Sequence, residues 1–106
     1  MIKLEDFKKL EIKIGKILEV NDHPNADKLY VVKVDLGDLQ KQLVAGIKGS
    51  YAKEALVGKQ VVVLTNIEPA TLRGVESQGM LLAASDETGI FVLTTDKPVK
   101  LGSIVK

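Results

Sequence analysis

The chain of 106 residues is long enough for one domain with a single buried core. Its 15 lysines and arginines nearly balance 14 aspartates and glutamates, and a net charge of +1 argues against a strongly basic nucleic-acid binder. Cysteine is absent, which excludes disulfides and thiolate metal sites, and no apolar run approaches the roughly 20 residues of a membrane helix. We therefore expect a soluble, cytoplasmic protein.

The first half of the chain shows the period-two alternation of apolar residues that is typical of strands. Gly15 interrupts the first alternating run, and a glycine inside a strand often marks a bend. The segment 21–27, NDHPNAD, is rich in turn-forming residues. The predicted elements of this half are a helical turn over 5–10 and strands over 11–20, 30–36 and 42–45.

The second half begins with a predicted short helix over SYAKEAL, with Ser50 as its N-cap. The β-branched run VVVLT then predicts a fully buried strand. In chain order, the predicted elements of this half are a helix over 50–56 and strands over 61–65, 80–84, 89–93 and 100–105.

Several short strands with one helix among them favour an all-β fold. Long strand–helix–strand crossovers are absent, so the sheet should be mainly antiparallel. A five-stranded Greek-key barrel with a helix between its third and fourth strands is the OB-fold. We expect one such domain over residues 1–106, with terminal extensions outside the barrel.

The residues do not favour catalysis. The segment GVESQG spaces its serine as G-x-x-S-x-G, one residue longer than a nucleophile elbow, and His23 is the only histidine. With no cysteine and no acidic calcium-type loop, a metal site is not expected either. We expect a protein that is not an enzyme and needs no cofactor.

A compact polar cluster, residues 73–78, separates two apolar runs. One explanation is a ligand-contact loop, in which Arg73 binds phosphate, Ser77 and Gln78 form hydrogen bonds, and Met80 lies against a ribose or base. The other is an internally hydrogen-bonded turn, with Glu76 paired to Arg73 and Met80 in the core. The residues leave both explanations open.

Nucleic-acid binding is the function that such a barrel most readily supports, on the face of its second and third strands. Lys13, Lys28, Lys33 and Arg73 could each contact phosphate, although Lys33 taken singly is better explained as a solvated surface residue. Aromatic residues are scarce, which disfavours base stacking and favours recognition of a folded RNA by its backbone and shape.

Four segments resemble a known family: HPNADKL at 23–29, YVVKVDLG at 30–37, LVAGI at 43–47, and the run from 56 to 84. The two specific motifs among them are HPNADKL and LRGVESQGM. They closely resemble the tRNA-binding OB domain found on methionyl-tRNA synthetases and as free-standing, structure-specific tRNA-binding proteins. The resemblance covers nearly the whole chain. It implies tRNA binding in support of methionyl-tRNA synthetase, in cis or in trans.

By this resemblance, tRNA-contacting positions map onto Lys28, Ser77 and Met80, with other candidates nearby. Many relatives carry arginine where this chain has Lys13, which keeps the charge but loses a two-pronged phosphate contact. The full set of candidate tRNA-binding residues is Lys13, Asn25, Lys28, Asn66, Arg73, Ser77, Gln78 and Met80.

The resemblance also implies a homodimer, formed by the terminal segments 1–10 and about 91–106. A related alternative is the CsaA-type export chaperone, which shares the fold and the DFxKxxIxxG-like start. Those chaperones generally lack HPNADKL and SQGM, so we rank a peptide-binding function below tRNA binding.

Overall fold

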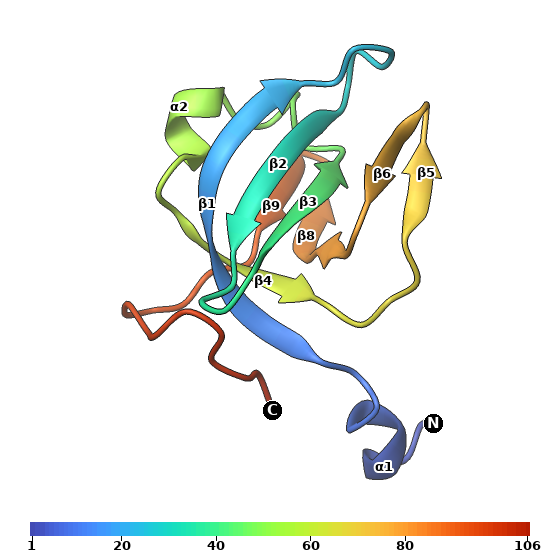
Figure 1. Cartoon of the computed structure of the whole chain (residues 1–106), viewed down its shortest axis with the longest axis vertical. Coiled ribbons are helices and arrows are strands. Elements are labelled where there is room, and N and C mark those ends of the chain that lie inside the picture. The colour runs from blue at the N-terminus through green and yellow to red at the C-terminus, as the bar shows by residue number, and fades with distance from the viewer.

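Strand β1 (Ile12–Asp22) organises the sheet because it pairs with two different strands along its length. In the computed structural model, which describes all 106 residues, the first half of β1 pairs with β4 and the second half with β2. The change of partner falls at Lys16, which pairs with both strands, and β1 curves along its length from one side of the barrel to the other (Figure 1). The register of β1 shifts between Ile17 and Glu19, two residues beyond Gly15, where the sequence predicted a bend.

The other elements follow in the order that the sequence predicted, with one additional hairpin. They are α1 (Leu4–Phe7), β2 (Tyr30–Asp35), β3 (Gln40–Ala45), α2 (Lys53–Leu56), β4 (Gln60–Leu64), β5 (Ala70–Leu72), β6 (Val75–Ser77), β7 (Met80–Leu81), β8 (Ala83–Asp86) and β9 (Gly89–Val92). Neither helix is long enough to cross a membrane.

The main sheet has the order β3-β2-β1-β4-β7, and every neighbouring pair is antiparallel. The predicted five-stranded OB-type barrel, with a short helix between its third and fourth strands, is therefore confirmed. Its interior holds one cluster of twelve buried residues: Ile17, Val20, Tyr30, Val32, Val34, Leu36, Leu43, Ala45, Ile47, Leu56, Val61 and Val63.

Side chains of the predicted polar cluster close the barrel along the free edge of β3. The backbone N–H of Gln42 donates to Gln78 Oε1 at 2.9 Å, and the N–H of Val44 donates to Ser77 Oγ at 2.9 Å. In return, the Gln78 N–H donates to the Gln42 carbonyl at 2.8 Å, and Gln42 Nε2 donates to the Glu76 carbonyl at 2.8 Å. The edge of β3 is thus satisfied partly by side chains instead of by a full strand ladder.

The C-terminal segment covers a second free edge, along the first half of β1. Ile14 donates to the Ser103 carbonyl at 2.9 Å, while Gly102 and Val105 donate to the carbonyls of Ile14 and Ile12 at 2.8 Å each. The strand predicted over 100–105 is therefore wrong as a regular element, since only an isolated bridge joins Ile104 to Lys13. Residues 101–102 form a turn, and Gly102 has a φ of +87°, which interrupts the extended geometry that a ladder needs.

Both helices are shorter than predicted. Helix α1 covers Leu4–Phe7 instead of 5–10, and α2 covers Lys53–Leu56 instead of 50–56. Ser50 does not cap α2, because its Oγ accepts the N–H of Ile90 from β9 at 3.0 Å. Ala52 occupies the N-cap position without a side-chain hydrogen bond.

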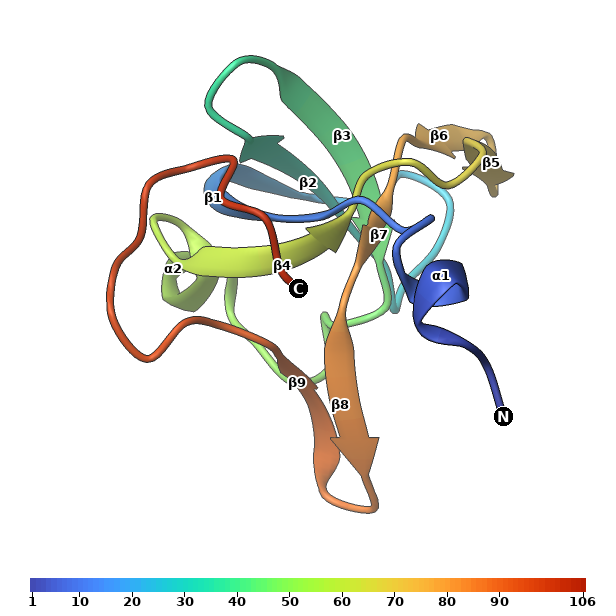
Figure 2. The ribbon, with the colours of Figure 1, turned by 90° about the horizontal axis from the view of Figure 1, so that it is seen from below.

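The strand predicted over 80–84 is divided between two sheets. Strand β7 pairs with β4, whereas β8 leaves the barrel and pairs with β9. The resulting hairpin projects from the barrel in Figure 2. Its base is fastened by the hydrogen bond from the Val92 N–H to the Tyr51 hydroxyl, at 3.1 Å.

We expect Gly15→Ala to lower the free energy of unfolding by about 1–3 kcal/mol, because the added carbon overfills the interior. A Cβ at Gly15 would lie 2.4 Å from Val34 Cγ1 and 3.1 Å from the Asp35 carbonyl oxygen. Urea denaturation measures the change. Gly49→Ala is the matched control, since no atom lies within 4 Å of its Cβ position, and an equal loss in both variants would contradict the packing explanation.

We expect Ser77→Ala to cost about 1–3 kcal/mol of stability, because the Val44 N–H loses its acceptor. The Ser77 side chain is buried, with 6% of the residue exposed, so water cannot easily replace it. Thermal and urea denaturation should both report the loss. Ser85→Ala on the exposed strand β8 is the control, and unchanged stability in both variants would disprove a structural role for Ser77.

Candidate nucleic-acid interface

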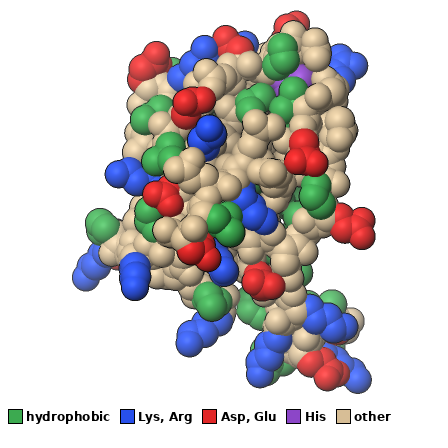
Figure 3. All heavy atoms as spheres, viewed as in Figure 1, with side chains coloured by type: hydrophobic (Ala, Val, Ile, Leu, Met, Phe, Trp, Pro, Cys, Tyr) green, Lys and Arg blue, Asp and Glu red, His purple; other side chains and the backbone are tan.

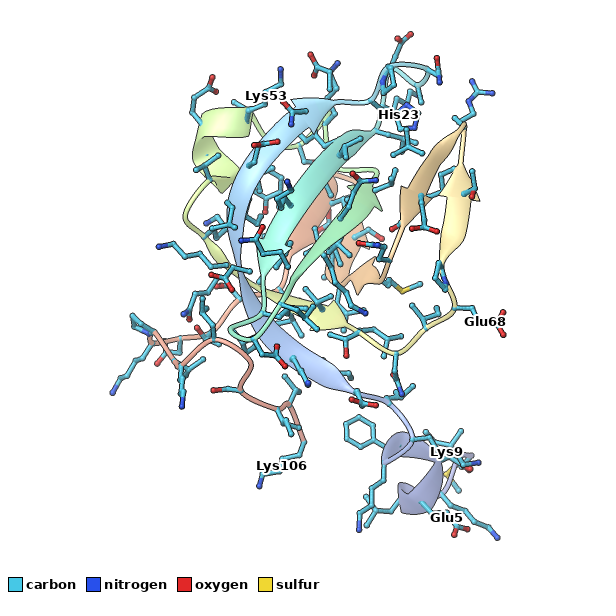
Figure 4. All side chains as sticks on the ribbon, in the orientation of Figure 1. Glu5, Lys9, His23, Lys53, Glu68 and Lys106 are labelled. Atoms are coloured by element: carbon cyan, nitrogen blue, oxygen red, sulfur yellow. The ribbon has the colours of Figure 1, made fainter.

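The two motifs that carry the family resemblance meet at one end of the barrel. The loop 23–29 lies against the tip of the β5–β6 hairpin, and Figure 4 places His23 beside that tip. His23 Nε2 is 2.8 Å from the Leu72 carbonyl oxygen, and Asn25 Nδ2 donates to the Arg73 carbonyl at 2.9 Å. Segments about 50 residues apart in the chain therefore form one structural unit.

Arg73 and Gly74 form the two-residue turn of this hairpin, between paired residues Leu72 and Val75. Both have positive φ angles, +54° for Arg73 and +90° for Gly74, as a type I′ turn requires. Arg73 is the only residue other than glycine with a positive φ, a conformation that costs arginine energy. The hydrogen bond from Asn25 holds this turn, and the exposed guanidinium has no carboxylate within ion-pairing distance.

The cations near this end of the barrel differ in their availability. Lys48 and Lys53 both contact the Asp22 carboxylate, at 3.2 Å and 3.0 Å. Hydrogen bonds from Lys53 and then Lys48 lower the pKa of Asp22, and the Asp22 hydrogen bond raises the pKa of Lys53. Lys28, in the loop that carries His23, is exposed and has no such partner. Lys28 and Arg73 are therefore the free cations of this unit.

The structure combines parts of both explanations for the polar cluster. Ser77 and Gln78 are committed to β3, and Ser77 Oγ also donates to the Gly79 carbonyl at 3.0 Å. The expected Glu76–Arg73 ion pair is absent, and Met80 is 46% exposed instead of buried in the core. The cluster is an internally bonded hairpin that nevertheless presents Arg73 and Met80 to solvent.

Met80 lines an open groove of about 420 Å³ between the β5–β6 hairpin, β3 and β8. Most of its lining is apolar, including Ile67, Leu72 and Ile90. The groove contains one carboxylate, that of Glu68, and no lysine or arginine. It can therefore accept an apolar group but not, on its own, a phosphate.

Asn66 has an internal role in the structure. Its Oδ1 accepts the Glu11 N–H at 2.8 Å, and its Nδ2 donates to the Lys9 carbonyl at 2.8 Å. The amide thereby fastens the end of the N-terminal segment to the barrel. Because both ends of the amide are engaged, Asn66 is not brought together with Lys28 and Arg73 as a free RNA contact.

Lys13 lies at the opposite end of β1 from the loop 23–29. The strand has 11 residues, so its two ends lie up to roughly 30 Å apart. Lys33 lies on β2 opposite Glu19, in a mixed-charge environment. Figure 3 likewise shows basic and acidic side chains interspersed over the face that it displays. The structure therefore groups Asn25, Lys28 and Arg73 but does not place every candidate cation on one surface.

Sequence reasoning missed the part played by His23. It treated this residue only as a possible base for a serine, whereas the structure makes it a buried link between loop and hairpin. Its position in HPNADKL could have indicated this role, because that motif contacts the other motif of the resemblance, LRGVESQGM, through Leu72. No group of three or more histidine, aspartate or glutamate side chains is arranged to hold a metal ion.

Comparisons of the sequence and of the fold with known proteins identify the family of this chain. Residues 12–104 match the family model described as "Putative tRNA binding domain". The chain is 57% identical over 105 residues to a methionine–tRNA ligase of Thermococcus onnurineus, covering 99% of this chain and 14% of that protein. It therefore spans about one seventh of the length of that relative.

Two solved structures match the entire fold. A protein related to methionyl-tRNA synthetase from Pyrococcus horikoshii superposes with a TM-score of 0.92 at 30% identity, over 100% of this chain and 98% of that one. The CsaA chaperone of Picrophilus torridus also gives a TM-score of 0.92 at 30% identity, over 100% of both chains. Because the family model spans nearly the whole barrel, the chain belongs to the tRNA-binding domain family.

Proposed function

We propose that this chain binds tRNA by shape, without catalysis, as an auxiliary module of methionyl-tRNA synthetase in cis or in trans. The observation that carries the proposal is the bonded pair of motifs at one end of the barrel. His23 and Asn25 hold the hairpin tip, while Lys28 and Arg73 remain exposed and unpaired. The identity to methionine–tRNA ligases supports the link to aminoacylation, and we propose the cytoplasm as its location.

In this proposal the candidate residues have different roles. Lys28 and Arg73 contact phosphates, since both present free positive charge. Met80 lies against a ribose or base edge from the rim of the apolar groove. Ser77, Gln78 and Asn66 support the binding surface from within, through the hydrogen bonds that they make to β3 and to the N-terminal segment.

Asn25 belongs to both groups in this proposal, because its Nδ2 holds the Arg73 turn while its side chain remains exposed. Lys13 is left out of the principal interface, since it lies at the far end of β1. With a net charge of +1, the isolated chain has little long-range attraction for RNA. Such a module would therefore act mainly by raising the local concentration of tRNA beside a synthetase.

We expect Lys28→Ala and Arg73→Ala each to weaken binding to different tRNA species about equally. Each substitution should also reduce the slope of log affinity against log salt by about one, because one phosphate contact is lost. Gel-shift or fluorescence titrations at several salt concentrations give both quantities. Lys106→Ala removes the same charge at the opposite end of the molecule and is the control (Figure 4).

Selective loss of one tRNA species would instead indicate base readout and contradict recognition by shape. Equal effects of Lys106→Ala and Lys28→Ala would contradict the location of the interface.

The alternative function is peptide binding of the CsaA type. It is favoured by the apolar groove beside Met80 and by the whole-chain match to a CsaA chaperone. The same titrations distinguish the two functions if unfolded polypeptide is added as a competitor. Direct binding of labelled unfolded polypeptide, together with no binding of folded tRNA, would establish the chaperone function and exclude ours.

We also propose a homodimer formed by residues 1–10 and about 91–106. Apolar side chains are exposed on these terminal segments, with Leu4 at 68% and Ile104 at 67%. Asn66 anchors the N-terminal segment to the barrel, so that its apolar residues are held in position for a second copy. A two-fold dimer would place two tRNA-binding surfaces on one particle.

We expect the unaltered chain to be a dimer by light scattering, and the double variant Leu4→Glu/Ile104→Glu to be a monomer. Burying two carboxylates at an apolar interface is strongly unfavourable. Leu39→Glu is the control, because Leu39 is an exposed apolar residue outside the terminal segments. A monomeric unaltered chain at micromolar concentration would refute the proposed dimer.

A further inference from the structure

The imidazole of His23 is buried between the loop 23–29 and the β5–β6 hairpin, with only 5% of the residue exposed. Each of its ring nitrogens has a partner in the backbone. Nε2 is 2.8 Å from the carbonyl oxygen of Leu72, and Nδ1 accepts the N–H of Asn25 at 2.9 Å. The His23 backbone N–H in turn donates to the Leu29 carbonyl at 3.2 Å, which closes the loop on itself.

These two partners determine where the proton of the ring must be. A carbonyl oxygen can only accept, so Nε2 must carry a hydrogen. A backbone N–H can only donate, so Nδ1 must present its lone pair. The arrangement therefore requires the neutral Nε2–H tautomer. A second proton on Nδ1 would point directly at the N–H of Asn25 and break that hydrogen bond.

Asn25 connects the ring to the Arg73 turn. Its backbone N–H binds His23, and its side-chain Nδ2 binds the Arg73 carbonyl. Arg73 sits at φ +54°, a conformation that arginine does not favour by itself. The turn therefore depends on hydrogen bonds from outside the hairpin. His23 binds the Leu72 carbonyl directly, and it holds Asn25, which binds the adjacent Arg73 carbonyl.

No charged side chain is hydrogen-bonded to the ring. No carboxylate oxygen lies within 4.0 Å of its nitrogens. Along its own loop, the charged residues nearest to His23 in sequence are Asp22, Asp27 and Lys28. The Asp22 carboxylate forms ion pairs with Lys48, from the β3–α2 connection, and with Lys53, from α2. From the hairpin, the nearest charged residue in sequence is the cation Arg73.

We propose that His23, in its neutral Nε2–H form, is a positioning residue that holds Arg73 in its RNA-binding conformation. This inference rests on the proposed function, because it assigns to His23 the geometry of a phosphate contact. His23 itself is buried and does not touch the RNA. Its protonation would release Asn25, relax the Arg73 turn and weaken tRNA binding.

The direction of the pH effect separates this proposal from simple electrostatics. A histidine that merely lies near the interface would gain positive charge on acidification and strengthen the binding of a polyanion. Here the hydrogen bond from the Asn25 N–H exists only while Nδ1 carries no proton, so a proton on the ring would oppose binding. Affinity for tRNA should therefore fall, and not rise, on acidification.

The binding test compares the unaltered 106-residue chain with His23→Ala, His23→Gln, Arg73→Ala and the double variant His23→Ala/Arg73→Ala. At pH 8, His23→Ala should lower affinity about tenfold and reduce the salt slope by about one, although it removes no charge. The double variant should bind no more weakly than Arg73→Ala alone, because both changes remove the same contact. His23→Gln keeps a donor for the Leu72 carbonyl and gains no proton, so its affinity should be independent of pH.

Circular dichroism shows whether each variant is folded, and His23→Gln keeps the test valid if His23→Ala does not fold. Tighter binding of the unaltered chain at low pH would overturn the proposal. Additive effects of His23→Ala and Arg73→Ala would overturn it as well.

A nuclear magnetic resonance measurement tests the same link without RNA. His23 is the only histidine, so its ring nitrogen signals need no assignment. We expect a protonated Nε2 and an unprotonated Nδ1 at pH 8, and an Arg73 amide shift that changes with the protonation of the ring. An Nδ1–H tautomer, or an Arg73 amide insensitive to His23, would refute the link. Absence of tRNA binding at pH 8 by the unaltered chain, with the link intact, would instead refute the proposed function.

Discussion

The backbone groups along the free edge of β3 impose the constraint on which the rest of this structure depends. A barrel of five short strands must satisfy the hydrogen-bonding groups at its seam, because buried donors without partners are costly. Here the seam is closed by Ser77 and Gln78, whose side chains accept the N–H groups of Val44 and Gln42. The β5–β6 hairpin is consequently held against β3, and its tip is brought to the end of the barrel where the loop 23–29 emerges.

The position of that tip explains why two distant motifs behave as one unit. Arg73 occupies a strained turn that hydrogen bonds from a neighbouring loop hold in place. Local strain of this kind is maintained only where the surroundings determine the conformation. The guanidinium exposed by this turn is the group to which we assign a phosphate contact in the proposed function. Lys48 and Lys53, in contrast to Arg73, form ion pairs with the Asp22 carboxylate at the start of the loop.

The terminal segments complete the barrel in a different way. The C-terminal residues cover the edge of β1 that β2 leaves open, and the N-terminal segment is fastened by Asn66. Their contacts with the barrel use backbone groups and a few apolar side chains, including Phe7 and Val105, which pack on Ile12 and Ile14. Other apolar side chains remain outside, which is the physical basis for proposing a second copy as their partner.

The sequence by itself determined the number and order of the main strands, their antiparallel pairing and the curvature of the first strand, which contains Gly15. These features follow from local periodicity and from the absence of a side chain, both of which are visible in a short window. It also contains the two motifs, HPNADKL and LRGVESQGM, on which the family resemblance rests. Only the tertiary structure decided what each polar residue does, because a hydrogen-bonding partner 30 to 60 residues away leaves no local pattern. Ser77, Gln78 and Asn66 therefore lie inside the fold's own network, His23 becomes a link, and Lys13 is separated from Lys28 and Arg73 by the length of β1.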